Sequence, residues 1–347
     1  MAQYFTERLQ KVFHMIFKSY NQEMAQEGLR QLELIVNNQH TPEQPNHRAL
    51  RNDMTTSLEN EIDTKEDALK IANNPEAREI ADAYALLARI YAGPRFTWEE
   101  SNFPENNMRT YQCLHDSIRR CSPIGNLQAL RINGTITPTV EKDMLISFDD
   151  AFRIVYNYAE QGDAFCQYII GNVFFWRDDD RISLARDMIT PPRKSWSKRI
   201  QQSLQKGSIQ ERLATLQGTV SDETLQENAT KLAKEWFNKA LDNGLAMFQG
   251  NLRNIYIDEG DFNNARRVAL TAAELGNPTM MLYTGLDCHE HGKFEDAFTW
   301  FTKGAALGQA ESTAELADYY YHFYDTKELR RVIPYDPVKA IGLYRRA

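Results

Sequence analysis

The sequence lacks the features that identify several classes of protein. Only four of its 347 residues are cysteines, which is too few for a disulfide-stapled scaffold. No apolar run approaches the roughly 20 residues that a membrane-spanning helix needs. The run from Val12 to Phe17 is interrupted by His14 and is too short for the apolar part of a secretory signal. We therefore expect a folded cytoplasmic protein with reduced thiols.

An excess of basic residues is also missing. The 48 acidic residues outnumber the 40 lysines and arginines, which gives a net charge of -8. Nucleic acids and anionic membranes are polyanions that a bound protein must neutralise, so neither is expected as the main partner. With 42% hydrophobic and 25% charged residues the chain is not disordered. Its length predicts either several domains or an elongated array.

The short motifs of common enzyme classes are absent as well. The sequence has no GxxxxGKS/T, GxGxxG, GxSxG or HExxH string, and so it gives no local support for a phosphate loop, a nucleophile elbow or a zinc protease helix. We predict no catalytic residue, no cofactor, no metal and no small-molecule substrate.

The second half of the chain has a repeat with a fixed step. Three segments run from an alanine to a glycine with the same internal spacing, and their starts follow one another at a constant 32-residue step: Ala233–Gly244, Ala265–Gly276 and Ala297–Gly308. At one fixed distance after each glycine the sequence has Tyr256, Cys288 or Tyr320. Apolar residues within each segment follow helical spacing, so two helices and two turns form one unit. Such a pair cannot bury its apolar faces alone, and neighbouring units must stack.

The same spacing occurs on either side of this block. Ala151–Gly162 forms an upstream unit, but it starts more than two repeat steps before Ala233, so a segment near 176–230 interrupts the array. The apolar residues of this insertion fall at helical spacing, and it either packs along the array or forms an arm that engages a partner: Ile200, Leu204, Ile209, Leu213 and Leu216. A further unit begins at Ala340 and reaches only half a helix pair, which either caps the array or continues in a longer protein.

This pattern resembles the Sel-one-like repeat, a relative of the tetratricopeptide repeat. The closest matches are WFNKALDNGLA, WFTKGAALGQAES and DPVKAIGLYRRA, and the resemblance covers about residues 149–175 and 231–347. It implies a superhelix of helix pairs that binds proteins and lacks intrinsic catalysis. Similar repeat proteins serve bacterial signalling, secretion and toxin-neutralising systems.

We therefore predict an all-α fold, a right-handed α-solenoid of stacked antiparallel helix pairs, with at least four units after Asp149. Residues 147–347 form the array in this interpretation. Residues 1–146 form a less regular helical region, which could consist of degenerate repeats, with helices expected over three segments: Phe5–Tyr20, Met24–Val36 and Glu76–Tyr91.

Three local clusters suggest other sites. A metal site is one interpretation of Cys288, His289 and His291. However, Cys288 stands at the repeat's core position, and the sequence has no second pair of ligand residues to complete a tetrahedral site. The acidic run 178–180 is more typical of a solvated helix end. Between Pro191 and Arg199 four cations surround Trp196, a composition that suits phosphates and bases, although an acidic protein partner or an internal contact is favoured.

The repeat step also predicts a binding surface. Positions on the first helix of each unit that stacking does not need recur at the repeat step and must project along one surface: Glu235, Lys239, Arg267, Thr271, Thr299 and Lys303. Arg266, Arg345 and Arg346 are expected on the same helices. Within the aromatic cluster 319–324, Tyr320 fills the core position, and Tyr319 or Tyr321 is the candidate anchor for a partner.

These observations predict a non-enzymatic scaffold or adaptor that binds a protein of unknown identity. The candidate partner-binding residues are Arg267, Lys303, Tyr319, Tyr321 and Trp196. Two alternatives stay open: a regulatory or enzyme-associated protein with a site in residues 1–146, and a toxin-neutralising, immunity-type binding protein.

Overall fold

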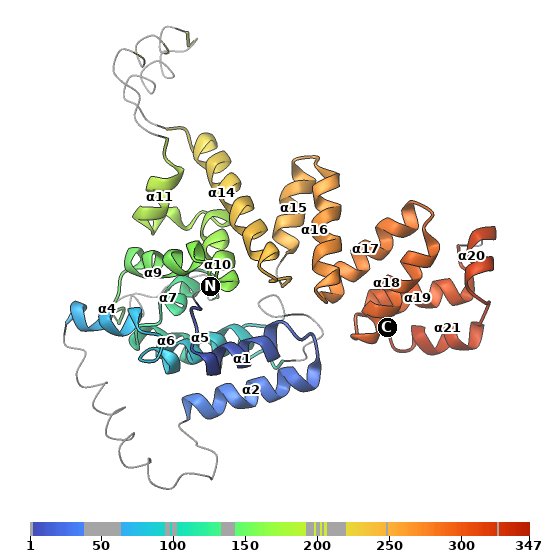
Figure 1. Cartoon of the computed structure of the whole chain (residues 1–347), viewed down its shortest axis with the longest axis horizontal. Helices are drawn as coiled ribbons and strands as arrows, with labels where there is room; N and C mark the ends of the chain where they lie inside the picture. Colours follow the sequence, from blue (N-terminus) through green and yellow to red (C-terminus); the bar gives the residue numbers. More distant parts are fainter. Residues whose placement is uncertain are drawn as a thin grey trace.

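The computed structural model describes most of the chain. The described residues are 3–37, 64–93, 98, 103–132, 143–191, 198, 202, 205–206, 220–247, 249–324 and 326–347. Within these ranges the regular structure is helical and contains no strand, which confirms the predicted all-α class. In Figure 1 the N-terminal helices gather into one block, and the later helices extend from it as a row that ends near α20.

The N-terminal block is built from helices that pack pairwise. Its members are α1 (Glu7–Phe17), α2 (Gln22–Val36), α4 (Lys65–Asn73), α5 (Glu79–Tyr91), α6 (Asn107–Arg119) and α7 (Pro123–Ile132). Helix α1 packs on α2, and α5 packs against α2, α6 and α7. The predicted helices over Phe5–Tyr20, Met24–Val36 and Glu76–Tyr91 are therefore confirmed as α1, α2 and α5, with somewhat different bounds.

Cys113 and Cys121 lie in different elements. Helix α6 ends at Arg119, and Cys121 lies in the turn before α7 with a positive φ of 67°. Pro123 starts the new helix, where a missing backbone N–H is tolerated. Both thiols are free and buried, and burial raises the pKa of each to about 11.

The predicted units appear as successive helix pairs. They are α9 (Phe148–Glu160) with α10 (Ala164–Phe175), α14 (Asp222–Asp242) with α15 (Gly250–Asp258), α16 (Phe262–Glu274) with α17 (Pro278–Glu290), and α18 (Phe294–Ala306) with α19 (Ala310–Tyr321). Helices α20 (Lys327–Val332) and α21 (Pro337–Tyr344) follow. Each helix packs on the next from α14 to α19, α10 packs on α14, and α19 packs on α21. The described pairs thus form the stacked array; its handedness stays a prediction.

Glycines in the left-handed region terminate helices at the repeat step. Gly244, Gly276 and Gly308 have φ values of 79°, 102° and 89° and close the turn inside each unit. The next residue usually caps the second helix: the side chains of Asn277 and Gln309 accept hydrogen bonds from backbone N–H groups of α17 and α19. Leu245 has no such oxygen, and α15 begins only at Gly250.

The predicted insertion is partly structured. It contains the short 3-10 helix η3 (Asp178–Asp180) and α11 (Ser183–Ile189), and α11 packs against α9 and α14. Helix α14 also starts earlier than its repeat equivalents, because Ser221 caps it and Leu225 and Ala229 are buried. The apolar positions from Ile200 to Leu216 lie outside the described residues.

The hydrophobic core is continuous across the expected boundary at residue 146. One buried cluster extends from Tyr4 to Met281, and a second from Leu282 to Leu343. A buried polar network joins the same parts: Arg78 Nε donates to Asp82 (3.0 Å), and Tyr4 N donates to Asp163 at the start of α10 (3.0 Å). The division into two domains stays a prediction.

Candidate functional site

The surface predicted from the repeat step is exposed to solvent. Glu235 in α14, Arg267 in α16 and Thr299 in α18 are all exposed, as are Lys239 and Lys303; Thr271 is half-buried. We call these six positions the helix stripe. They lie on α14, α16 and α18, so the first helices of three units contribute to the helix stripe.

Two lysines of the helix stripe lie over tryptophan rings. Lys239 Nζ is 3.9 Å from the ring centroid of Trp236, and Lys303 Nζ is 4.3 Å from that of Trp300. The two pairs stand two repeat steps apart in the sequence. A cation over an aromatic face gains electrostatic attraction, so these ammonium groups are held close to the helix surface.

The predicted arginines differ in their surroundings. Arg267 is exposed, and its Nη2 donates to Asn238 at 2.6 Å, which links α16 to α14. Arg266 is paired with Asp287 of α17 at 2.6 Å. The expectation that Arg345 and Arg346 lie on a first helix is wrong, because α21 ends at Tyr344.

The aromatic cluster has one buried and one exposed candidate anchor. Tyr319 is 0% exposed, and its hydroxyl lies 2.7 Å from Nδ1 of His289, so it is a core residue. The prediction that Tyr319 contacts a partner is therefore wrong: on α19 its ring faces α17 and α18, where it packs against Phe301. Tyr321 is 48% exposed, and the nearby Phe323 is 67% exposed. Of the two candidate anchors, Tyr319 and Tyr321, only Tyr321 is therefore accessible to a partner.

The metal-like clusters have other roles in the fold. Among the described residues, no group of histidine, cysteine and acidic side chains is arranged to hold a metal ion. His289 bonds Tyr319, and His291 bonds the backbone oxygen of Asp287. Cys288 is half-buried against the core, and this burial raises the pKa of its thiol. No helix in the described part of the chain is long and apolar enough to cross a membrane.

In the acidic run 178–180, Asp178 and Asp179 are buried in ion pairs, and only Asp180 is exposed to solvent as a solvated turn would be. Asp178 pairs with Arg131 of α7, and Asp179 is held by Arg177 and Arg186. Burial alone would raise the pKa of Asp179, but the hydrogen bonds from the two guanidinium groups lower it below its ordinary value. Trp196 lies outside the described residues, and its predicted role stays a prediction.

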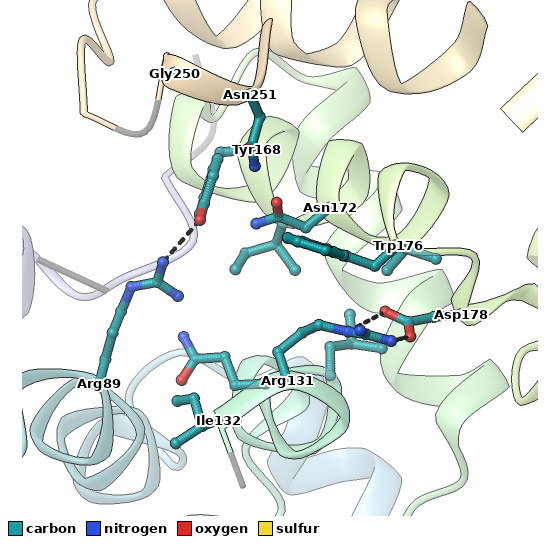
Figure 2. A pocket seen from close by; sticks show the side chains of 13 residues that line it. Arg89, Arg131, Ile132, Tyr168, Asn172, Trp176, Asp178, Gly250 and Asn251 are labelled. Carbon is teal, nitrogen blue, oxygen red and sulfur yellow. Dashed lines mark hydrogen bonds and ion pairs between the residues drawn. The ribbon is translucent and has the colours of Figure 1, made fainter. Parts of the chain in front are cut away.

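The structure also contains a pocket that the sequence did not predict. Its volume is about 450 Å³, and it lies between α5, α7, α10 and the start of α15 (Figure 2). The apolar part of the wall comes from Leu127, Ile132, Ile169 and Val173. The polar part comes from side chains of four helices and η3: Arg89, Gln128, Arg131, Tyr168, Asn172, Asp178 and Asn251.

Two contacts between side chains organise the polar wall. Arg131 holds Asp178 through Nε, at 3.0 Å, and through Nη2. Arg89, which is 3% exposed, donates from Nη2 to the Tyr168 hydroxyl at 2.9 Å. Figure 2 shows these contacts on opposite sides of the pocket, with Trp176 projecting between Asn172 and Arg131.

Some polar atoms of the wall have no partner in the described part of the chain. Gln128 is 3% exposed, yet neither its Nε2 nor its Oε1 makes a hydrogen bond there. Oδ1 of Asn172 is also without one. Buried polar groups are nearly always paired, so these amides are the strongest sign of a ligand among the described residues.

Comparisons with known proteins find similarity to two solved structures. No protein-family model and no curated protein matches the chain. A Sel1 repeat protein from Oxalobacter formigenes is similar in structure, with 14% identity, a TM-score of 0.38, and coverage of 84% of this chain and 94% of that one. The protein c5321, a protective antigen of uropathogenic Escherichia coli strains with an SLR fold, has 15% identity, a TM-score of 0.29, and coverage of 77% and 61%.

Proposed function

We propose that the chain is a non-enzymatic scaffold that binds a protein partner through the helix stripe. The observation that carries this proposal is the recurrence of exposed, mixed-charge positions on α14, α16 and α18 at one 32-residue step. A surface of this kind offers many modest polar contacts along an extended partner.

The exposed ring of Tyr321, at the end of the second helix α19, is the candidate aromatic contact. Aromatic side chains carry a large share of the binding energy in protein interfaces, and Tyr321 lies 6.1 Å from the ring of Tyr335, which is 57% exposed. The partner is therefore expected to combine polar contacts along the helix stripe with an apolar contact at Tyr321.

The test is quantitative capture of a partner by the full chain, followed by a measured dissociation constant for the purified complex. Replacing Arg267, Lys303 and Tyr321 together with alanine should weaken binding at least about tenfold, since about 1.4 kcal/mol corresponds to a factor of ten. Lys11 in α1 and Arg119 in α6 are exposed cations outside the array, and their double alanine variant is the matched control. Equal affinity in both variants would contradict the proposal.

We also propose a cytoplasmic location. All four cysteines are free, and burial raises the pKa of the fully buried Cys166 thiol well above its ordinary value, which keeps it unreactive. Fractionation of cells that produce the native protein tests this: recovery from an oxidising compartment would contradict it.

A further inference from the structure

The side chain of Gln128 points to a ligand in the pocket. An amide that is buried without a partner destabilises the folded protein, and leucine would fill nearly the same volume in this helix at no such cost. The amide of Gln128 carries an N–H donor and an acceptor oxygen side by side, both of them buried and neither paired in the part of the chain that the structure describes. Its complement is a flat group that carries an adjacent acceptor and donor, as the edge of a nucleobase does.

A second amide faces the pocket from another helix. Asn172 belongs to α10, and its Oδ1 is an acceptor without a partner among the described residues. Figure 2 shows Asn172 beside Trp176 on the wall of the pocket. The two amides come from α7 and α10, so a ligand edge held by both would be fixed in orientation as well as in place.

Trp176 supplies a flat surface next to these amides. It caps the C-terminus of α10, is 50% exposed, and packs edge-on against Phe175 at 4.9 Å. The guanidinium carbon of Arg131 lies 5.7 Å from its ring centroid. A half-exposed indole beside a guanidinium group suits the stacking of a heteroaromatic ring, which is attracted to both groups.

The opposite side of the pocket favours an anion. Tyr168 lies there beside Asn251 of α15 in Figure 2, and Arg89 reaches the Tyr168 hydroxyl from the facing wall. Gln249 makes no side-chain cap on α15, and the first two residues of that helix, Gly250 and Asn251, line the pocket. The described lining contains two arginines and one carboxylate, which leaves one net positive charge in a chain of net charge -8.

From these contacts we propose that the pocket binds a purine nucleotide. The base lies on Trp176 with its edge toward Gln128 and Asn172, and the phosphate lies toward Arg89 and the start of α15. A volume of about 450 Å³ suits one nucleotide. The acidic chain disfavours a nucleic-acid strand. This site is independent of the helix stripe and involves binding only.

Calorimetric titration of the full chain with AMP and with GMP tests the proposal. We expect one site per chain for at least one of them, and at least about tenfold weaker binding by Gln128→Leu and by Trp176→Ala. Phe262→Ala is the control, because Phe262 is an exposed aromatic residue, 58% exposed, that does not line the pocket. Gln128→Leu should unfold at the same or a higher temperature than the unmodified protein, so lost binding would not reflect lost folding.

Other outcomes overturn the proposal. Absence of binding by both nucleotides at millimolar concentration would remove it, and binding that Gln128→Leu leaves unchanged would place the nucleotide elsewhere. Inorganic phosphate that binds as tightly as AMP would show an anion site without base recognition. The triple alanine variant of Arg267, Lys303 and Tyr321 should bind nucleotide normally, so failure here and failure of the scaffold proposal can be told apart.

Discussion

Gly285 of α17 lies directly against the ring of Phe301 of α18. A Cβ atom on Gly285 would be 2.5 Å from Cε1 of Phe301, closer than real side chains approach. The same relationship joins Gly171 of α10 to Phe237 of α14, at 2.6 Å. Phe237 and Phe301 are two repeat steps apart. At both places, a glycine in the second helix of one pair packs against a phenylalanine in the first helix of the next pair.

Replacing Gly285 with alanine should therefore destabilise the array. Phe301 is 0% exposed and has no room to withdraw, and overpacking of this kind costs about 1–3 kcal/mol. Chemical denaturation of the full chain measures the change in the free energy of unfolding.

Gly342→Ala is the matched control for this experiment. Gly342 is also inside a helix, α21, but a Cβ atom there meets nothing within 4 Å. Alanine is favoured over glycine inside a helix by about 0.5–1 kcal/mol, so this variant should be neutral or more stable. Equal stability changes in the two variants would contradict the close approach at Gly285.

The sequence predicted the units well because each unit is local. Turn glycines such as Gly276 and the apolar spacing of α16 act within a few residues, and both are visible as a 32-residue step. The step does not show which residue meets Gly285, because that depends on how α17 crosses α18. One repeat step earlier, Arg253 of α15 and Ala269 of α16 stand at the positions of Gly285 and Phe301, so the pairing is not strictly repeated.

The buried pair of Arg78 and Asp82 should be critical for the N-terminal block. The two side chains are 0% and 1% exposed, and Ser122 also donates to Asp82 at 2.7 Å. Removing one partner of a buried pair leaves the other charge uncompensated and costs about 3–5 kcal/mol. We expect Asp82→Asn to lose about this much stability in thermal or denaturant unfolding.

A double variant separates the charge effect from packing. Arg78→Met with Asp82→Leu removes both charges together, and apolar replacement of a whole buried pair is often close to neutral. The double variant should therefore be more stable than either single one. If its loss equals the sum of the single losses, the pair does not act as a unit.

The ion pairs of Asp179 predict a dependence of stability on pH. Arg177 and Arg186 lower the pKa of this carboxyl in the folded state. Its stabilising contribution is therefore complete above the unfolded pKa of about 3.9 and is lost as pH falls through the lower folded value. Thermal unfolding between pH 7 and pH 3 should show a smaller acid-induced loss for Asp179→Asn than for the unmodified chain. Parallel curves would contradict this assignment.

The pocket could not be predicted from the sequence, for a physical reason. Its residues come from segments far apart in the chain, from Arg89 through Gln128 and Asn172 to Gly250, and only folding brings them together. The one local signal is polar residues inside otherwise apolar helices, such as Gln128 and Arg131 in α7. The helix stripe was predictable because the repeat step alone places its residues on one surface.

The last prediction follows from the different burial of Tyr319 and Tyr321. Tyr319 is buried among Phe298, Phe301 and His289, and truncating a buried aromatic residue costs about 3–5 kcal/mol. Tyr319→Ala should therefore unfold at a clearly lower temperature, and Tyr319→Phe should lose only about 1 kcal/mol, for the hydrogen bond to His289. Tyr321→Ala, at an exposed position, should change the free energy of unfolding by no more than about 0.5 kcal/mol. A Tyr321 variant as unstable as Tyr319→Ala would show that Tyr321 belongs to the core and cannot serve as the anchor for a partner.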